Sequence, residues 1–210
     1  MRLGWIASGV LLTAMISACG SSTGPSDPTA SGVATSVEAP TQSARPTLTD
    51  AKLQPPSQDN RYTQSSRRSK VDFDPCTWID AADIESVGFV SGSRKRGPDL
   101  VAEYTFLTCT FRNPDNTMSL GVDSGNISWD ENLQKNGSWL EQTTINGRRA
   151  GWGAGAPGTT DECHVQMETK AGVVLLWTGI LSNGQAKNLD PCANIMEIAS
   201  VVEKSIGEEN

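Results

Sequence analysis

The sequence has little of what builds metal sites and histidine-dependent active sites. It holds one histidine, His164, in 210 residues, and its five cysteines nowhere form a Cys-x-x-Cys pair. Structural zinc sites gather four cysteine or histidine ligands at short spacings, and an activated nucleophile needs a histidine or another base beside it. We interpret His164 as a polar residue on the outer face of a strand. The sequence therefore predicts no metal, no cofactor and no catalytic residue, and we expect the protein not to be an enzyme.

Positive charge is also scarce in the part of the chain that can fold. Residues 71–210 contain 10 basic and 20 acidic side chains, a net charge of −10, against −7 for the whole chain. Nucleic acids and anionic lipid headgroups attract basic surfaces. The acidic balance therefore argues against a nucleic-acid partner and against direct electrostatic attachment to a membrane.

The apolar run at the N-terminus is too short to span a bilayer, which takes about 20 residues. It extends from Leu3 to Ile16, follows the positive charge of Arg2, and leads into the small residues Ser17 and Ala18. A charged start, a short apolar run and small residues are the parts of a secretory signal peptide. Residues 1–18 are therefore predicted to be a lipoprotein signal peptide that is removed from the mature protein.

The four residues from Ile16 to Cys19 resemble a bacterial lipobox, in which the cysteine is diacylated on sulfur. The alternative is an ordinary secretory signal with a chance cysteine at its end. Assigning Cys19 to lipid leaves four cysteines, an even number that suits two disulfides in an oxidising compartment. We expect a protein anchored by acyl chains on the extracytoplasmic face of the cell membrane.

Residues 20–70 have the composition of a flexible linker, rich in Gly, Ser, Thr and Pro. Tyr62 is its one aromatic residue, and no apolar periodicity appears that could offset the entropy of ordering. A flexible coil of this length has a root-mean-square span of about 40 Å. The linker would hold a folded domain, residues 71–210, above the membrane.

Helices are predicted at both ends of this domain. Asp74 followed by Pro75 is a capping pair that starts a helical segment over residues 75–87, and Gly88 ends it. Asp190 and Pro191 repeat the pattern for a final helix that Gly207 ends. The residues of its core-facing stripe have helical spacing: Ile195, Ala199, Val202 and Ile206.

Strands are predicted between the two terminal helices. Apolar and polar residues alternate over residues 104–111, 118–122 and 162–169. Residues 173–181 are almost all apolar, as in a central strand buried on both faces, and Trp177 would belong to the core. Asn146-Gly147 is typical of a hairpin turn, and residues 129–135 indicate a middle helix. The pattern predicts an α+β fold, with terminal helices packed on an antiparallel sheet.

The four cysteines of the domain fall into two similar halves. Each half has one cysteine in an Asp-Pro-Cys helix start and one on the apolar side of a strand. Three connectivities are possible, and we favour Cys76–Cys109 with Cys163–Cys192. Each bridge would then fasten a terminal helix to the sheet.

Several motifs, taken in order, resemble those of a known family. They are Phe73-Asp74-Pro75-Cys76, Cys109-Thr110-Phe111, Asn146-Gly147-Arg148, Cys163 and Asp190-Pro191-Cys192, together with the lipobox. The set is similar to the actinobacterial lipoproteins grouped as domain of unknown function 3558. The resemblance implies an actinomycete envelope lipoprotein and transfers one site, the acylated Cys19. It implies no reaction, substrate or catalytic residue.

A candidate binding surface lies in the least regular part of the domain, beside a glycine-rich loop over residues 147–158. Its residues are Trp129, Trp139, Trp152, Arg148 and Arg149. Two functions are compatible with this surface. The first is a non-catalytic envelope module that binds a protein partner or assists a membrane complex. The second is a carrier or sensor of an apolar or glycan ligand that stacks on the indoles.

Overall fold

The computed structural model describes residues 48–155, 158–208 and 210. The predicted signal peptide, Cys19 and the first part of the predicted linker lie outside these residues. Helical segments within them are η1 (Ala51–Leu53), α1 (Arg61–Ser66), α2 (Pro75–Trp78), α3 (Ala81–Ser86), α4 (Trp129–Asn136), α5 (Ser182–Gln185) and α6 (Ile195–Ile206). None of the helices in this part of the chain has the length and apolar character needed to cross a membrane.

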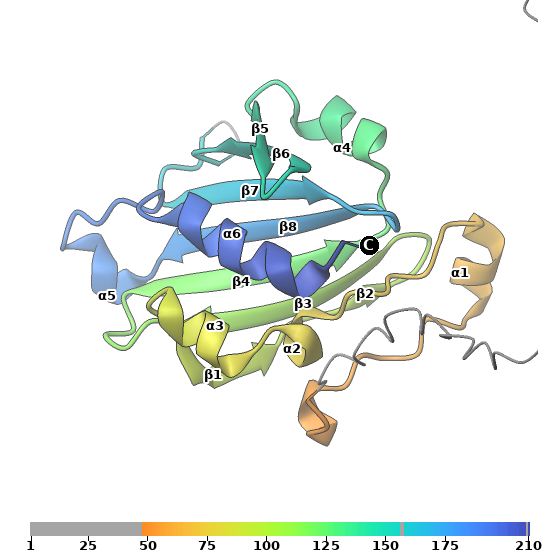
Figure 1. Ribbon diagram of the computed structural model, residues 1–210, viewed down its shortest axis with the longest axis horizontal. Coiled ribbons are helices and arrows are strands. Elements are labelled where there is room, and N and C mark those ends of the chain that lie inside the picture. Colours follow the sequence, from red (N-terminus) through yellow and green to blue (C-terminus); the bar gives the residue numbers. More distant parts are fainter. Residues whose placement is uncertain (1–47, 156–157, 209) are drawn as a thin grey trace, which may run out of the picture. The chain divides into compact units, whose positions relative to one another are not determined.

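In the described residues, eight strands form one sheet, and each of their pairings is antiparallel. They are β1 (Val90–Arg96), β2 (Leu100–Val101), β3 (Thr105–Arg112), β4 (Met118–Gly125), β5 (Glu141–Ile145), β6 (Arg148–Gly153), β7 (Glu162–Glu168) and β8 (Val173–Ile180). The order across the sheet is β1-β3-β4-β8-β7-β6-β5, and β2 also pairs with β3 (Figure 1). The α+β class and the antiparallel sheet predicted from the sequence are confirmed.

The central position of β8 follows from one long connection. After the β3–β4 hairpin, the chain passes through α4 to the far edge of the sheet and returns through β5, β6 and β7. This return places β8 between β7 and β4, with Gly121 of β4 directly opposite Trp177 of β8. The predicted central position of this strand is therefore confirmed, whereas its predicted burial on both faces is wrong at Leu175 and Trp177, which are half-buried.

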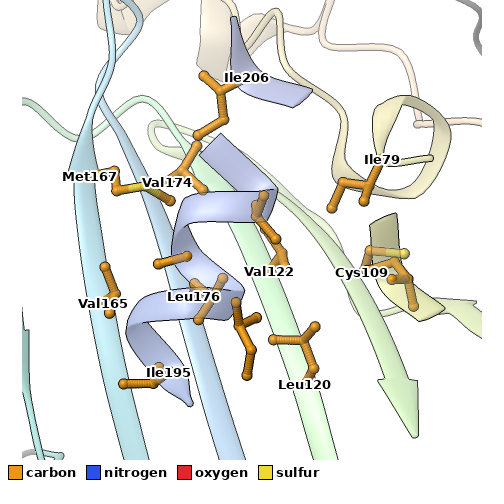
Figure 2. Packing of buried hydrophobic residues seen from close by; sticks show 14 of the residues in the cluster. Ile79, Cys109, Leu120, Val122, Val165, Met167, Val174, Leu176, Ile195 and Ile206 are labelled. Atoms are coloured by element: carbon orange, nitrogen blue, oxygen red, sulfur yellow. The ribbon is translucent and has the colours of Figure 1, made fainter. Parts of the chain in front are cut away.

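One face of the sheet carries the main core. On β3, the side chains of Thr105, Leu107, Cys109 and Phe111 are buried, whereas the residues between them are half-buried. This is the alternation expected for a strand covered on one side. Helices α2, α3 and α6 lie over this face (Figure 1), and Figure 2 shows Val174 and Leu176 of β8 beneath α6. The predicted stripe on α6 is buried throughout: Ile195, Ala199, Val202 and Ile206.

The first predicted helical segment is two short helices. The carboxylate of Asp74 accepts from the backbone N–H of Cys76 at 3.1 Å and caps α2. The carboxylate of Asp80 accepts from the N–H of Ala82 at 3.0 Å and caps α3. Gly88, with φ of +87°, stands just after α3 in a conformation that favours glycine. Both caps follow from the local sequence.

The prediction that the final helix begins at Pro191 is wrong. Helix α6 begins at Ile195, after Asn194 in the left-handed conformation, and the carboxylate of Asp190 caps only a turn by accepting from the N–H of Cys192. The segment before the helix is tied to the sheet, because the hydroxyl of Thr178 donates to the carbonyl of Pro191. The chain must therefore turn at Asn194 before α6 can lie along the core face.

Both disulfides have the predicted connectivity. Cys76 joins Cys109 across a sequence separation of 33, and Cys163 joins Cys192 across 29. The first fastens α2 to β3, and the second fastens the segment before α6 to β7. Loops of this length correspond to a stabilisation of about 3–4 kcal/mol for each bridge on chain-entropy grounds.

Ordered structure begins earlier than the predicted boundary near Val71. The N–H of Leu48 donates to the carbonyl of Thr77 at 2.9 Å, and Gln58 makes two hydrogen bonds to the backbone of Val71. The side chain of Asn60 caps α1 and also donates to the carbonyl of Val101 at 3.1 Å. Residues 48–70, which the sequence assigned to the linker, therefore form an N-terminal arm that contacts the domain.

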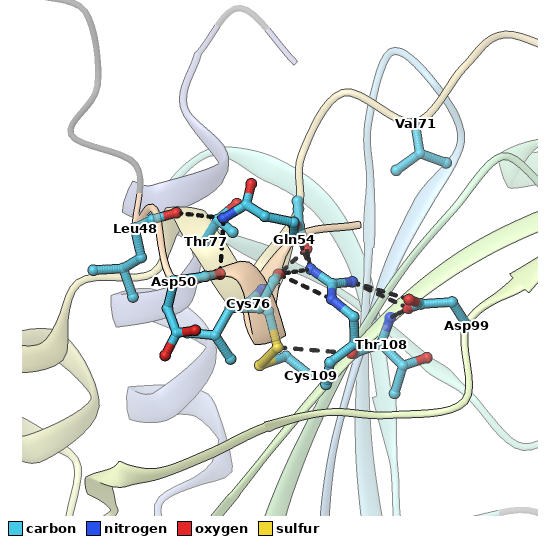
Figure 3. A network of polar contacts seen from close by, with 12 residues as sticks. Leu48, Asp50, Gln54, Val71, Cys76, Thr77, Asp99, Thr108 and Cys109 are labelled. Carbon is cyan, nitrogen blue, oxygen red and sulfur yellow. Dashed lines mark hydrogen bonds and ion pairs between the residues drawn. A yellow bond between two sulfur atoms is a disulfide. The ribbon is translucent and has the colours of Figure 1, made fainter. Parts of the chain in front are cut away.

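Strand β1 was not predicted, and it explains how the arm is held. Its sequence is polar and basic, without apolar alternation. The guanidinium of Arg96 donates to the carbonyl of Leu53 in the arm and contacts the carboxylates of Asp74 and Asp99. Asp99 in turn accepts from the N–H of Thr108 on β3 at 2.8 Å (Figure 3). At this edge of the sheet, hydrogen bonds and ion pairs therefore hold the segments together, whereas apolar contacts do so in the core.

Candidate functional site

The sheet surface opposite α2, α3 and α6, called the open face below, is only partly covered. Helix α4 lies over one part of it, where Ile127, Trp129 and Val173 form a second, smaller core. In this part the amide of Asn132 on α4 donates to Gln166 on β7. The remainder of the open face carries half-buried side chains from β3, β4, β8 and β7.

Trp177 occupies the middle of the uncovered part. The strand registers place it in one row with Thr110, Gly121, His164 and Gly153. A Cβ atom at Gly121 would lie 2.1–2.3 Å from three atoms of the indole ring, so the ring lies directly against the backbone of β4. The absence of a side chain at Gly121 is what allows this close approach. One face of the indole is therefore packed on the sheet.

Two further aromatic rings lie against glycines of this face. A Cβ atom at Gly125 would be 2.4 Å from the ring of Phe106, and one at Gly153 would be 3.0 Å from the ring of Trp139. Trp139 also makes an edge-to-face contact with His164, with ring centroids 5.6 Å apart. Trp177, His164 and Trp139 thus form a line across β8, β7 and β6, which we call the aromatic strip.

Asp123 fixes the orientation of the Trp177 ring. The indole N–H donates to Oδ2 of Asp123 at 3.2 Å, and the two residues come from neighbouring strands. Burial raises the pKa of Asp123, while hydrogen bonds from Thr108 and Trp177 act in the opposite direction. The carboxylate is therefore a partly desolvated acceptor beneath the edge of the indole.

A hollow of about 290 Å³ opens beside the indole of Trp177. Its lining combines this aromatic ring and small apolar surface with hydroxyls, carboxylates and one cation: Thr110, Arg112, Ser119, Asp161, Glu162, Trp177, Gly179, Ile180 and Leu181. Glu162 is 41% exposed at its side chain and lies 3.2 Å from the ring of His164. The hollow can therefore offer one flat apolar surface and several hydrogen-bonding groups to the same ligand.

The five residues predicted to form a binding surface do not lie together. Trp139 is part of the aromatic strip, but Trp129 is only 4% exposed and belongs to the core under α4. Trp152 packs against the main core, on the opposite side of the sheet. The prediction of one surface containing all three indoles is wrong, because Trp152 lies on the core face of β6 and Trp129 is buried between α4 and the sheet.

The two arginines of the predicted surface have structural partners. Arg148 is largely buried, pairs with Glu203 at 2.9 Å and donates to the carbonyl of Gly207 at 2.6 Å, so it holds the end of α6. The guanidinium of Arg149 lies 5.1 Å from the ring centre of Trp129 and 3.4 Å from the carboxylate of Glu168. Neither arginine takes part in the hollow beside Trp177.

Sequence reasoning missed Trp177 by assigning it to the core. The strand is buried on its core face, but Leu175 and Trp177 are only half-buried on the open face. The neighbouring strand β4 could have indicated that this face is not a core face. It carries Gly121 and Asp123 at positions where a buried face would carry large apolar residues. A glycine opposite a tryptophan indicates a ring that lies flat on the sheet.

The described part of the chain contains no group of three or more histidine, cysteine, aspartate or glutamate side chains placed to hold a metal ion. His164 lies 3.2 Å from the carboxylate of Glu162 and makes an edge-to-face ring contact with Trp139.

Comparison with known proteins places the chain in a family. Residues 14–205 match the family described as "Protein of unknown function (DUF3558)". The chain belongs to this family. The match covers the folded domain up to residue 205, the N-terminal arm, the rest of the predicted linker and part of the predicted signal peptide. No curated protein and no solved structure matches the chain. Membership in DUF3558 therefore agrees with the resemblance in the motifs, and assigns no activity.

Proposed function

We propose that this DUF3558 protein is a non-catalytic binding module of the cell envelope, anchored by lipid at Cys19. The open face around Trp177 is the part that engages a ligand or partner. The lipobox and the signal peptide support the location, and the acidic domain supports a role away from nucleic acid. The aromatic strip carries the binding proposal.

The single observation behind the binding role is the flat placement of Trp177 on Gly121. A tryptophan buried in a core contributes stability through all of its surface, whereas this ring packs one side and leaves the residue half-buried beside a hollow. Aromatic residues that combine a large rigid surface with a polar edge are enriched where proteins bind other molecules. We infer that the ring is kept in this position for contact with a ligand.

The location is tested by a Cys19→Ser variant expressed in the native host. We expect the variant to leave the membrane fraction and to appear in the culture medium, because the sulfur that carries the acyl chains is gone. Cys19→Ala is a second variant without a nucleophile. Retention of both in the membrane fraction would contradict a lipid anchor at this residue.

The binding face is tested by oxidative footprinting with hydroxyl radicals. Oxidation is compared between the purified protein and the protein in intact cells, at Trp177 on the open face and at Met196, which is 37% exposed on α6. We expect protection in cells at Trp177 and none at Met196, because a bound molecule covers one face only. Equal oxidation of Trp177 in both samples, or equal protection at both sites, would contradict the proposal.

A further inference from the structure

We propose that the molecule bound on the open face is a glycan, whose pyranose rings lie on the aromatic strip. This inference rests on the proposed function and names the ligand class of the same site. Three observations carry it: the orientation of the Trp177 ring, the polar groups of the hollow, and the arrangement of three rings in a line.

The first observation is a flat aromatic surface. The indole of Trp177 packs one side on Gly121, and its N–H is used by Asp123. What remains for a ligand is the opposite π-face, which carries partial negative charge. One side of a pyranose ring presents C–H groups with partial positive charge and little polarity. The two surfaces are complementary in shape and in charge.

The second observation is the mixture of donors and acceptors beside that surface. The hollow is lined by Thr110, Ser119, Glu162 and Arg112. The hydroxyls of Thr110 and Ser119 donate to the carbonyls of Lys95 and Gly179, so what they offer a ligand is an acceptor oxygen. Sugar hydroxyls both donate and accept hydrogen bonds, so they can satisfy carboxylates and a guanidinium in one site. The hollow of about 290 Å³ is close to the lower end of small-ligand sites, which is about 300 Å³.

The third observation is the length of the aromatic strip. Trp177 pairs with His164 across β8 and β7, and Gly153, which Trp139 contacts, pairs with His164 across β7 and β6. Neighbouring strands lie about 4.8 Å apart, so the strip extends over roughly 10 Å. A surface of this length can support more than one sugar ring. We therefore infer a chain of linked sugars rather than a monosaccharide.

Other ligand classes fit these groups less well. A lipid chain is held in an enclosed apolar cavity, whereas this hollow lies on a sheet surface and includes Asp161 and Glu162. Phosphate-rich polymers would be repelled by the domain, which has a net charge of −10, and by the same two carboxylates in the hollow. A quaternary amine would favour a cage of several aromatic rings around one point, and here the rings lie in a line.

The test is two-dimensional NMR of the indole N–H signals in the mature chain carrying Cys19→Ser. The probes are tetrasaccharides of β-1,4-linked glucose, α-1,4-linked glucose, β-1,4-linked N-acetylglucosamine and α-1,6-linked mannose, with the matching disaccharides. We expect at least one tetrasaccharide to shift the Trp177 and Trp139 signals, and its disaccharide to bind more weakly. No shift at Trp177 with every probe at about 10 mM, above the millimolar range of weak binding, would overturn the proposal.

Variants of single residues distinguish a lost contact with the sugar from a loss of folded structure. Trp139→Ala should weaken the tetrasaccharide about tenfold and leave the disaccharide affinity unchanged, a difference that a purely structural loss would not produce. Glu162→Gln should weaken the binding of both the tetrasaccharide and the disaccharide. Tyr62→Ala removes an aromatic residue that is 50% exposed on α1 and should change neither. An equal loss of affinity for both sugars in Trp139→Ala would overturn the glycan proposal. Binding of choline, with no binding of any sugar, would also overturn it.

The two proposals fail in different ways. If footprinting protects Trp177 in cells while no sugar shifts its signal, the glycan is wrong and the binding module remains. If Trp177 is not protected in cells, the binding face itself is wrong.

Discussion

Arg96 and Asp74 form an ion pair inside the folded domain, with Nη2 of the arginine 2.7 and 2.6 Å from the two carboxylate oxygens. Their side chains are 11% and 5% exposed. The same guanidinium contacts Asp99 and the carbonyl of Leu53. One side chain of β1 thus connects the N-terminal arm, the start of α2 and the loop between β1 and β2.

Replacing Arg96 by methionine should destabilise the protein strongly. The substitution keeps much of the side-chain volume but leaves Asp74 and Asp99 buried without their cation, which typically costs about 3–5 kcal/mol. Chemical unfolding followed by circular dichroism measures the change. Lys70→Met is the matched control, because Lys70 pairs with Asp59 at the surface with exposures of 59% and 65%. An exposed pair contributes about 0–1 kcal/mol. Equal effects of the two variants would refute the role of the Arg96 network.

Gln58 provides a second test, directed at the N-terminal arm. Its amide nitrogen donates to the carbonyl of Val71 at 2.8 Å, and its amide oxygen accepts from the N–H of Val71 at 2.9 Å. Gln58→Ala leaves both backbone groups without these partners, and we expect a loss of about 1–3 kcal/mol in unfolding free energy. Gln54→Ala, at an exposed position of the same arm, should cost less. A neutral Gln58→Ala would mean that these two hydrogen bonds of the arm do not contribute to the stability of the domain.

The contrast between the arm and the strands shows what the sequence can predict. Strand β3 was predictable, because Leu107, Cys109 and Phe111 alternate with polar residues in the period of a one-sided strand. The disulfides were predictable because the two Asp-Pro-Cys motifs repeat. The strand signal is local and can be read within about ten residues of the chain, whereas the disulfide signal is the repeat of one short motif at the two ends of the domain.

The arm and β1 were not predictable for the same physical reason. Their stabilising contacts join residues far apart in the sequence, such as Arg96 with Leu53 and Arg68 with Glu131. Both segments are polar, and polar composition alone suggests a linker. The open face was missed because an almost continuous apolar run hides alternation: Leu176 and Trp177 both read as core residues, yet only Leu176 points into the main core.

A pH-dependent contribution is expected from the pair of Arg68 and Glu131. Two parallel contacts of 2.7 Å join the guanidinium to the carboxylate, and the N–H of Ser128 donates to the same carboxylate at 3.1 Å. Arg68 first, and then Ser128, hold the pKa of Glu131 well below its usual value. A lowered pKa means that the folded protein binds this proton less readily than the unfolded chain. The pair therefore stabilises the fold above about pH 4, and the contribution is lost on further acidification.

Glu131→Gln should remove this part of the pH dependence. The midpoint of thermal unfolding of the wild type should fall more steeply between about pH 5 and pH 2 than that of the variant. Glu168→Gln is the control, because Glu168 pairs with Arg149 at 3.4 Å in an exposed position. It should keep the slope of the wild type. A Glu131→Gln variant with the wild-type slope would show that another carboxylate determines the acid sensitivity.

The position of Trp177 can be tested without changing the tryptophan. In Gly121→Ala, the new methyl group would lie within about 2.3 Å of the indole, so the ring must leave the surface of β4. Its hydrogen bond to Asp123 is then lost, and the carboxylate stays partly desolvated. We expect a destabilisation of about 1–3 kcal/mol, as for other overpacked sites. The fluorescence of Trp177 should shift to longer wavelength as the ring moves into water.

Gly92→Ala is the matched control, because Gly92 also lies in a strand and a Cβ atom there meets nothing within 4 Å. Its effect on stability and fluorescence should be small. The double variant Gly121→Ala with Trp177→Ala gives the decisive comparison. If the cost of the methyl group comes from the ring above it, removing the ring must relieve that cost. Gly121→Ala should therefore destabilise the wild type by more than it destabilises Trp177→Ala, and an equal effect would mean that the ring does not rest on Gly121.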